Sequence, residues 1–215
     1  MKRFLIFGWL VLGTLTSATA QADRYATQMR KLLAEMDTVR GSKSTQELAY
    51  RFLRVATAEQ SKWLPYYYAS LCFVTAAYEE KDVTKIDALC DVAQQYVERA
   101  DSLSAPKVES LCLKSMIPLA RISVDVMKRG AANLIESKQL LQEAVALDNR
   151  NPRAFFLLGQ QLANMPTAFG GGKQKALPYF QKASQLFADK VAQEATLDVH
   201  WGRESNANML ALCQK

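Results

Sequence analysis

Apolar residues recur every three or four positions along almost the whole chain after residue 23, and no stretch alternates apolar and polar residues as a half-buried strand would. Spacings of three and four place side chains on one face of an α-helix. The pattern therefore predicts an all-α protein. The expected helices cover residues 24–39, 44–60, 63–79, 84–103, 106–128, 131–147, 153–164, 173–187 and 201–213.

Local signals predict where several of these helices begin and end. Ser44 and Glu47 match the S/T-x-x-E capping box, in which two side chains bond to exposed amides of the first turn. Pro118 lies inside the helix expected over 106–128 and should kink or split it, because proline removes a backbone donor. Gly130 is expected to mark the break before the following helix.

Four of the expected helices carry the same triplet of a small residue, an apolar residue four positions later and an alanine three positions after that. Those offsets bring the three side chains onto one helix face. The triplets begin at residues 49, 93, 137 and 176, so the intervals are 44, 44 and 39 residues. Small residues let helices approach closely, and the pattern therefore predicts stacked helical hairpins. The triplets are Ala49, Leu53 and Ala56; Ala93, Val97 and Ala100; Ser137, Leu141 and Ala144; and Ala176, Phe180 and Ala183.

The segment over residues 143–183 resembles a tetratricopeptide repeat (TPR), whose pattern is W-x2-L-G-x2-Y in the first helix and A-x3-F in the second. Glycine in the first helix lets the two helices of a hairpin touch. The chain departs from the family in its longer intervals, since the family period is about 34 residues, and in the expected first helices of the second and third hairpins, which lack the Leu-Gly pair. The matching residues are Phe155, Leu158, Gly159 and Leu162, followed by Ala176, Phe180 and Ala183.

This resemblance implies a right-handed α-solenoid of about four TPR-like hairpins with a C-terminal capping helix, over residues 21–215. It implies a non-catalytic scaffold that binds a protein or peptide partner in the cell envelope. The chain is also similar to exported TPR-like proteins of bacterial envelopes, among them the T-components that accompany some solute transporters. The alternative function is therefore an accessory of envelope solute transport that binds a small apolar ligand.

Solenoids of this type bind partners on the concave surface that their first helices line. The partner-groove residues that we expect there are Tyr68, Gln160, Gln161 and Asn164. Tyr68 belongs to a dense aromatic cluster with Trp63, Tyr66 and Tyr67. Aromatic residues at helical spacing are usually core, but Tyr68 lies on a different face and is expected to be exposed.

The first twenty residues have the pattern of a secretory signal peptide. Lys2 and Arg3 give a positive start, an apolar run follows over residues 4–15, and the sequence then predicts cleavage after Ala20. The other reading is an uncleaved anchor, but the apolar run is shorter than the roughly 20 residues that span a bilayer. We expect a periplasmic or secreted protein without stable membrane insertion after cleavage.

The charge of the chain argues against nucleic acid as a partner. The formal net charge is +6, and it falls to +4 when Lys2 and Arg3 are removed with the signal peptide. The basic residues are dispersed and form no dense block, whereas nucleic-acid binding needs a concentrated basic surface.

The four cysteines offer one candidate disulfide. Cys72 and Cys90 lie at equal distances from an expected turn near Lys81, so they would face each other across two antiparallel helices. The alternative is that the cysteines are buried thiols acting as small apolar residues. No CxxC motif or Cys/His cluster occurs in the sequence, so neither a metal nor a cofactor is expected.

A glycine-rich stretch is a candidate anion or partner loop. It consists of Gly170, Gly171, Gly172 and Lys173, where free amides at a helix start and a lysine could meet an anion. It fails the phosphate-binding pattern, because Thr167 stands where that motif needs glycine. The alternative, which we favour, is a tight connection between two helices.

Catalysis has little support in the sequence. The chain contains one histidine, His200, and no nucleophile motif or ligand pair accompanies it. The acidic group of Glu79, Glu80 and Asp82 lies at an expected turn, where carboxylates stay solvated and do not form an acid–base pair. We therefore expect a binding protein and no enzyme.

Overall fold

The computed structural model describes residues 21, 23–190 and 197–214, and this part of the chain is helical, with nine α-helices and two short 3-10 helices. The all-α prediction is confirmed. The elements are a helix over residues 23–36, here called the N-terminal helix, then α2 (Ser42–Ala58), α3 (Trp63–Glu79), α4 (Val83–Ser102), α5 (Lys107–Arg121), η1 (Ile122–Val124), α6 (Val126–Leu147), α7 (Pro152–Asn164), η2 (Thr167–Phe169), α8 (Lys173–Lys190) and α9 (Arg203–Cys213).

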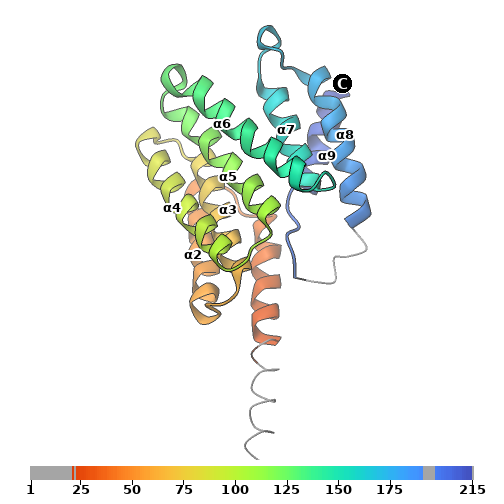
Figure 1. Cartoon of the computed structure of the whole chain (residues 1–215). Coiled ribbons are helices and arrows are strands. Elements are labelled where there is room, and N and C mark those ends of the chain that lie inside the picture. The colour runs from red at the N-terminus through yellow and green to blue at the C-terminus, as the bar shows by residue number, and fades with distance from the viewer. Residues whose placement is uncertain (1–20, 22, 191–196, 215) are drawn as a thin grey trace, which may run out of the picture.

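The helices pack in sequential pairs, as the hairpin pattern predicts. Helices α3 and α4, α5 and α6, and α7 and α8 form extensive contacts, and α9 packs against α8. Figure 1 shows α2 to α6 side by side in one part of the molecule and α7 to α9 in the other. The molecule is therefore a row of antiparallel pairs closed by α9.

The triplets occupy helix faces that are buried in the contacts between neighbouring helices. All of their residues are buried except Leu53, which is half-buried and packs against the core. Ser137 shows why a small polar residue is tolerated at such a position, because its hydroxyl donates to the backbone carbonyl of Ser115 on α5 at 2.6 Å. The prediction that these faces form helix contacts is confirmed.

Several predicted helix ends were wrong. Pro118 lies within α5, which continues to Arg121, and Gly130 lies within α6. The break falls between them at η1, where the Asp125 side chain accepts from the backbone amide of Lys128 and caps α6. The predicted capping box at Ser44 does not form, because α2 begins at Ser42 without a side-chain cap.

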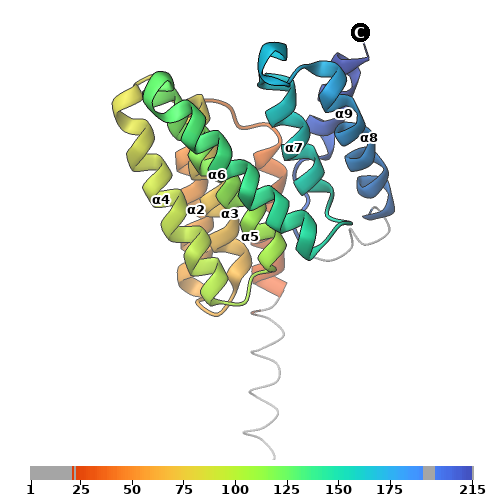
Figure 2. The same ribbon diagram turned by 45° about the horizontal axis from the view of Figure 1, so that its top comes forward.

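Two cores lie under these helices. The first joins the N-terminal helix with α2, α3, α4 and the second half of α5, and the second joins the start of α5 with α6, α7 and α8. A segment without regular secondary structure, residues 197–202, leads into α9 and is called the strap below. Figures 1 and 2 show it passing along the side of the N-terminal helix to reach α9. Val199 of the strap packs in the first core, although α9 itself packs against the second.

Candidate ligand cleft

A cleft lies between the N-terminal helix and α3 on one side and α7 and the start of α9 on the other. It consists of two adjoining cavities of about 370 and 650 Å³. Both cavities are lined by Met36, Asp37, His200 and Trp201, so they lie next to each other. The strap supplies two of these four residues and therefore forms a wall of both cavities.

The interior of the cleft combines an apolar surface with charged groups. Three arginines contribute guanidinium groups, and three carboxylates lie among them. The apolar residues are Leu33, Met36, Val39, Leu71, Met116, Phe156, Leu157 and Trp201, and the charged residues are Arg30, Asp37, Arg40, Glu79, Arg203 and Glu204. Such a mixture suits an apolar ligand that carries ionised groups at its edge.

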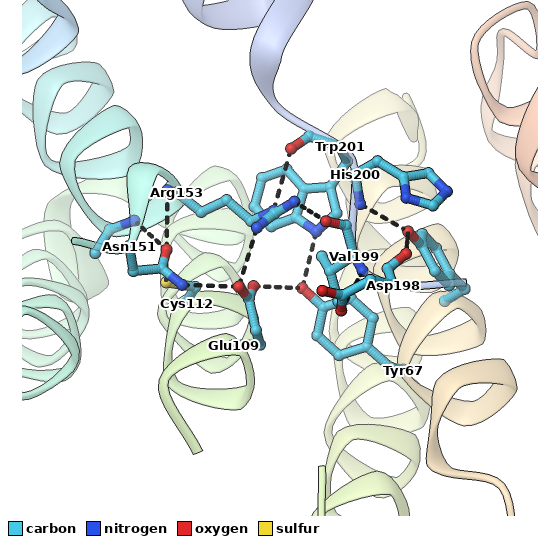
Figure 3. A network of polar contacts seen from close by, with 11 residues as sticks. Tyr67, Glu109, Cys112, Asn151, Arg153, Asp198, Val199, His200 and Trp201 are labelled. Atoms are coloured by element: carbon cyan, nitrogen blue, oxygen red, sulfur yellow. Dashed lines mark hydrogen bonds and ion pairs between the residues drawn. The ribbon is translucent and has the colours of Figure 1, made fainter. Parts of the chain in front are cut away.

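Arg153 of α7 holds the strap in place. Its side chain is 2% exposed, and it donates from Nε to the Trp201 carbonyl at 3.1 Å and from Nη1 to Glu109 Oε1 at 3.0 Å. It also donates from Nη2 to the Val199 carbonyl. Figure 3 shows the guanidinium between the strap and Glu109 of α5. One side chain thus fixes the carbonyl groups on both sides of His200.

The two adjacent tyrosines of α3 provide further anchors. The Tyr67 hydroxyl accepts from the Trp201 indole at 2.8 Å and donates to Glu109 Oε2 at 3.4 Å. The Tyr68 hydroxyl donates to the Asp198 carbonyl at 3.2 Å and accepts from the His200 amide at 3.1 Å. Every residue from 198 to 201 is therefore bonded to α3 or α7.

Glu109 and Asn151 complete this network from the start of α5 and of α7. Asn151 caps α7 by accepting from the amides of Arg153 at 2.9 Å and Ala154 at 3.3 Å. Its side-chain amide also donates to Glu109 Oε1 at 2.7 Å. The Glu109 carboxylate therefore accepts from an arginine, an asparagine and a tyrosine, which compensates for its burial.

Burial determines the protonation of these groups. It raises the pKa of the Tyr67 and Tyr68 hydroxyls and of the Cys72 thiol, which reinforces the neutral form of all three. Burial alone would lower the pKa of Arg153, but the Glu109 carboxylate and the neighbouring tyrosines outweigh it and raise that pKa.

Of the four expected partner-groove residues, two line the cleft and two do not. Tyr68 lines the smaller cavity, but it is buried, so its predicted exposure was wrong. Gln160 lines the larger cavity. Gln161 is buried instead and donates to the Ser137 hydroxyl, while Asn164 is exposed at the end of α7 and lines neither cavity.

The glycine-rich stretch forms a tight connection into α8. The amides of Gly170, Gly171 and Gly172 donate to the backbone carbonyls of Thr167, Pro166 and Leu162 respectively, at 2.9, 3.2 and 2.7 Å. The free glycine amides required for anion binding are therefore not present. Gly170 and Gly172 have φ of 84° and 105°, a conformation that favours glycine. Lys173 is exposed, and a role of this loop in contacting a partner stays a prediction.

The predicted disulfide is not formed, and no disulfide joins any of the four cysteines, Cys72, Cys90, Cys112 and Cys213. Cys72 lines the larger cavity, whereas Cys90 donates from Sγ to the Ile117 carbonyl of α5 at 3.8 Å. The two side chains thus leave their helices toward different neighbours. Equal distance from the turn at Lys81 did not account for the rotation of each helix about its axis.

Arg153, Glu109 and Trp201 were missed as functional residues by sequence reasoning. The Asn-Pro pair at residues 151–152 signals a helix start, but it does not reveal that the next residue is a buried arginine. His200, the weak catalytic candidate, is exposed at the cleft. Within the described residues, no group of three or more His, Cys, Asp or Glu side chains is placed to hold a metal ion.

Comparison with known proteins identifies the family. No family model matches the chain, and no curated protein matches it by sequence. None of the helices in the described ranges is long and apolar enough to cross a membrane. Among solved structures, the chain is similar to the HusA haemophore from Porphyromonas gingivalis, with 34% sequence identity, a TM-score of 0.77, and coverage of 88% of this chain and 92% of that one. This chain therefore belongs to the HusA haemophore family and is a binding protein rather than an enzyme.

Proposed function

We propose that this chain binds haem in the cleft between the N-terminal helix and α7. The observation that carries the proposal is the similarity, over 88% of the chain, to a protein described as a haemophore. The cleft adds independent support from its size and lining. Its two cavities, of about 370 and 650 Å³, lie in the range that is usual for sites of small organic ligands, about 300–1,000 Å³.

The lining suits the two chemical parts of haem. The flat macrocycle is apolar, and side chains such as Met36, Leu71 and Phe156 offer it a surface from which water is excluded. The two propionates are anionic, and Arg30, Arg40 and Arg203 supply guanidinium groups around the same space. Guanidinium and carboxylate pair well because the planar fork can donate two parallel hydrogen bonds.

The apolar and the charged residues of the cleft have separate roles in the proposal. It relies on burial of the macrocycle against the apolar lining and on pairing of the propionates with the arginines. His200 lines both cavities and is a direct contact of the ligand in this proposal.

The proposal includes the finer architecture that the sequence predicts. Sequential helix pairs with buried small residues support a right-handed TPR-like solenoid closed by α9. Gly159 supports the same reading, because a Cβ atom there would lie 2.8 Å from the Phe180 ring, so α7 and α8 touch at the position where the family has glycine. In this proposal the haem cleft lies on the concave side of that solenoid.

Export is part of the proposal as well. The signal peptide and its cleavage after Ala20 fall on residues 1–20, outside the described residues, and rest on the sequence pattern. A haem-binding protein in the periplasm or outside the cell is consistent with that pattern. Binding of a protein or peptide partner, the function first expected from the sequence, stays a prediction. The alternative expectation, binding of a small apolar ligand, resembles the haem proposal more closely.

Titration of the purified chain with haem tests the proposal. Binding is followed by the change in the Soret absorbance, and the site is tested with the variant Met36→Asp, which introduces a carboxylate into the wall of both cavities. Met127→Asp is the matched control, because Met127 is 94% exposed on the outer side of α6. We expect Met36→Asp to raise the dissociation constant at least about tenfold, corresponding to about 1.4 kcal/mol, and Met127→Asp to leave it unchanged.

Two results would contradict the proposal. A wild-type chain that shows no saturable Soret change does not have the proposed function. Equal affinity of the two aspartate variants, with far-UV circular dichroism showing both folded, would place the haem outside this cleft.

A further inference from the structure

We propose that Arg153 is the positioning residue of the haem cleft, because it holds the strap where His200 and Trp201 wall both cavities. This inference rests on the proposed function, since it concerns the same cleft. Arg153 itself lines neither cavity. Any effect of Arg153 on ligand binding therefore has to pass through the strap.

The geometry of the guanidinium matches that role. Three of its nitrogens donate to three acceptors, which are the carbonyls of Val199 and Trp201 and the carboxylate of Glu109. The strap has no helix or sheet of its own to satisfy its backbone groups, so its buried carbonyls need donors from elsewhere. Because the two carbonyls flank His200, fixing them also fixes the backbone that carries the His200 ring into the cleft.

An arginine is required here and a lysine is insufficient. The guanidinium presents five donors in one rigid plane, whereas the lysine ammonium is a single point of charge on a flexible stem. A buried ion pair is by itself a poor source of stability compared with well-packed apolar residues. Unlike an apolar residue, Arg153 donates to two backbone carbonyls of the strap, while Glu109 accepts from Arg153 and balances its charge.

Tyr67 anchors the same strap through a hydrogen bond of its own. Its hydroxyl accepts from the Trp201 indole at 2.8 Å and donates to Glu109, the carboxylate that also binds Arg153. The Tyr67 ring is buried and lines neither cavity. Removing this one hydroxyl therefore loosens Trp201 without changing any atom of the cleft surface.

The experiment compares Arg153→Lys and Tyr67→Phe with wild type. Arg121→Lys is the matched control, because Arg121 pairs with Asp87 and Asp91 away from the cleft. Three readouts are taken from each chain: the haem dissociation constant from Soret titration, the Soret circular dichroism of bound haem, and amide hydrogen exchange of the strap by mass spectrometry.

We expect Arg153→Lys to raise the haem dissociation constant about tenfold and Tyr67→Phe about threefold, since each loses buried hydrogen bonds. Both variants should exchange strap amides faster and show an altered Soret circular dichroism, which depends on how the bound haem is held. The control should match wild type in all three readouts.

The outcomes separate the two proposals. Faster strap exchange with an unchanged dissociation constant and an unchanged Soret dichroism would overturn the positioning role and leave haem binding in place. If Arg153→Lys fails to fold, Tyr67→Phe decides by the same criteria. Haem binding by the wild-type chain is measured before any variant is compared. If the wild-type chain does not bind haem, the proposed function is wrong.

Discussion

A charged side chain is unstable away from water unless its charge and its hydrogen bonds are matched. Arg153 is matched by one carboxylate and two carbonyls, and Glu109 receives donors from Arg153, Asn151 and Tyr67. Arg153 and Glu109 are therefore the centre of a buried polar network. The residues of this network come from α3, α5, α7 and the strap, so it joins four separate parts of the chain.

At the residue scale, the cysteines give a prediction that depends on pH. Burial raises the pKa of Cys90 to about 11 and raises that of Cys72 as well. The thiolate is the reactive form, so at pH 8 iodoacetamide should label the half-exposed Cys213 in the folded chain and leave Cys72 and Cys90 unmodified. Peptide mass spectrometry under reducing conditions measures this, and in urea all four should react.

The raised pKa of Cys90 also determines how the free energy of unfolding changes with pH. The unfolded thiol loses its proton near pH 8.5, whereas the folded Cys90 keeps it to about 11. The unfolded chain therefore binds fewer protons in that window, and the free energy of unfolding should fall as pH rises through it. In the labelling experiment described above, rapid modification of Cys72 at pH 8 without urea would contradict the burial of this thiol.

The residue scale is also where the sequence was least informative. Tyr68 was expected to be exposed because it lies on a different helical face from its aromatic neighbours, but Phe52 stacks on one side of it and the strap bonds to its hydroxyl. Arg153 carried no signal, since its partners lie 44 and more positions away in the chain. A residue's own type and local spacing cannot report such distant contacts.

At the scale of elements, helix type and number were predictable, because apolar periodicity reports which face of a helix is buried. The triplet in α8, with Phe180 at its centre, lies buried as expected. Single breaker residues were less reliable guides. Pro118 is accommodated inside α5, and Gly130 inside α6, because packing of the whole helix outweighs the preference of one residue.

Two glycines on neighbouring pairs give opposite predictions at this scale. A Cβ atom at Gly159 would meet the Phe180 ring at 2.8 Å, while nothing lies within 4 Å of one at Gly130. We expect Gly159→Ala to destabilise the fold by about 1–3 kcal/mol through overpacking, and Gly130→Ala to stabilise it by about 0.5–1 kcal/mol through helix propensity. Urea unfolding of both variants measures this, and equal effects would contradict the close approach of α7 and α8.

At the scale of the whole molecule, the cleft arises from the arrangement of two cores. The N-terminal helix and α3 form one side, α7 and α9 form the other, and the strap runs between them. Hairpin stacking could be predicted from repeated triplets. The strap could not, since its path depends on side chains of α3 and α7 that lie far from it in the chain.

The contact between the cores predicts a large stability loss on removing one charge. Arg153→Met leaves the Glu109 carboxylate buried without its ion-pair partner, and we expect a cost of about 3–5 kcal/mol in the free energy of unfolding. Lys85→Met is the control, because Lys85 pairs with Asp82 at the surface, where such pairs contribute about 0–1 kcal/mol. Urea denaturation compares the two, and a cost below about 1 kcal/mol for Arg153→Met would show that the ion pair does not hold the cores together.

The strap has a consequence for when a functional molecule exists. Stacked helix pairs mostly contact neighbours close in sequence, but here Tyr68 bonds to Asp198, 130 positions later. Contacts of such long range form slowly, because the intervening chain must first be brought into place. A chain still emerging from the ribosome can assemble its early hairpins, yet the cleft is completed only after the strap, residues 197–202, has been made and has docked.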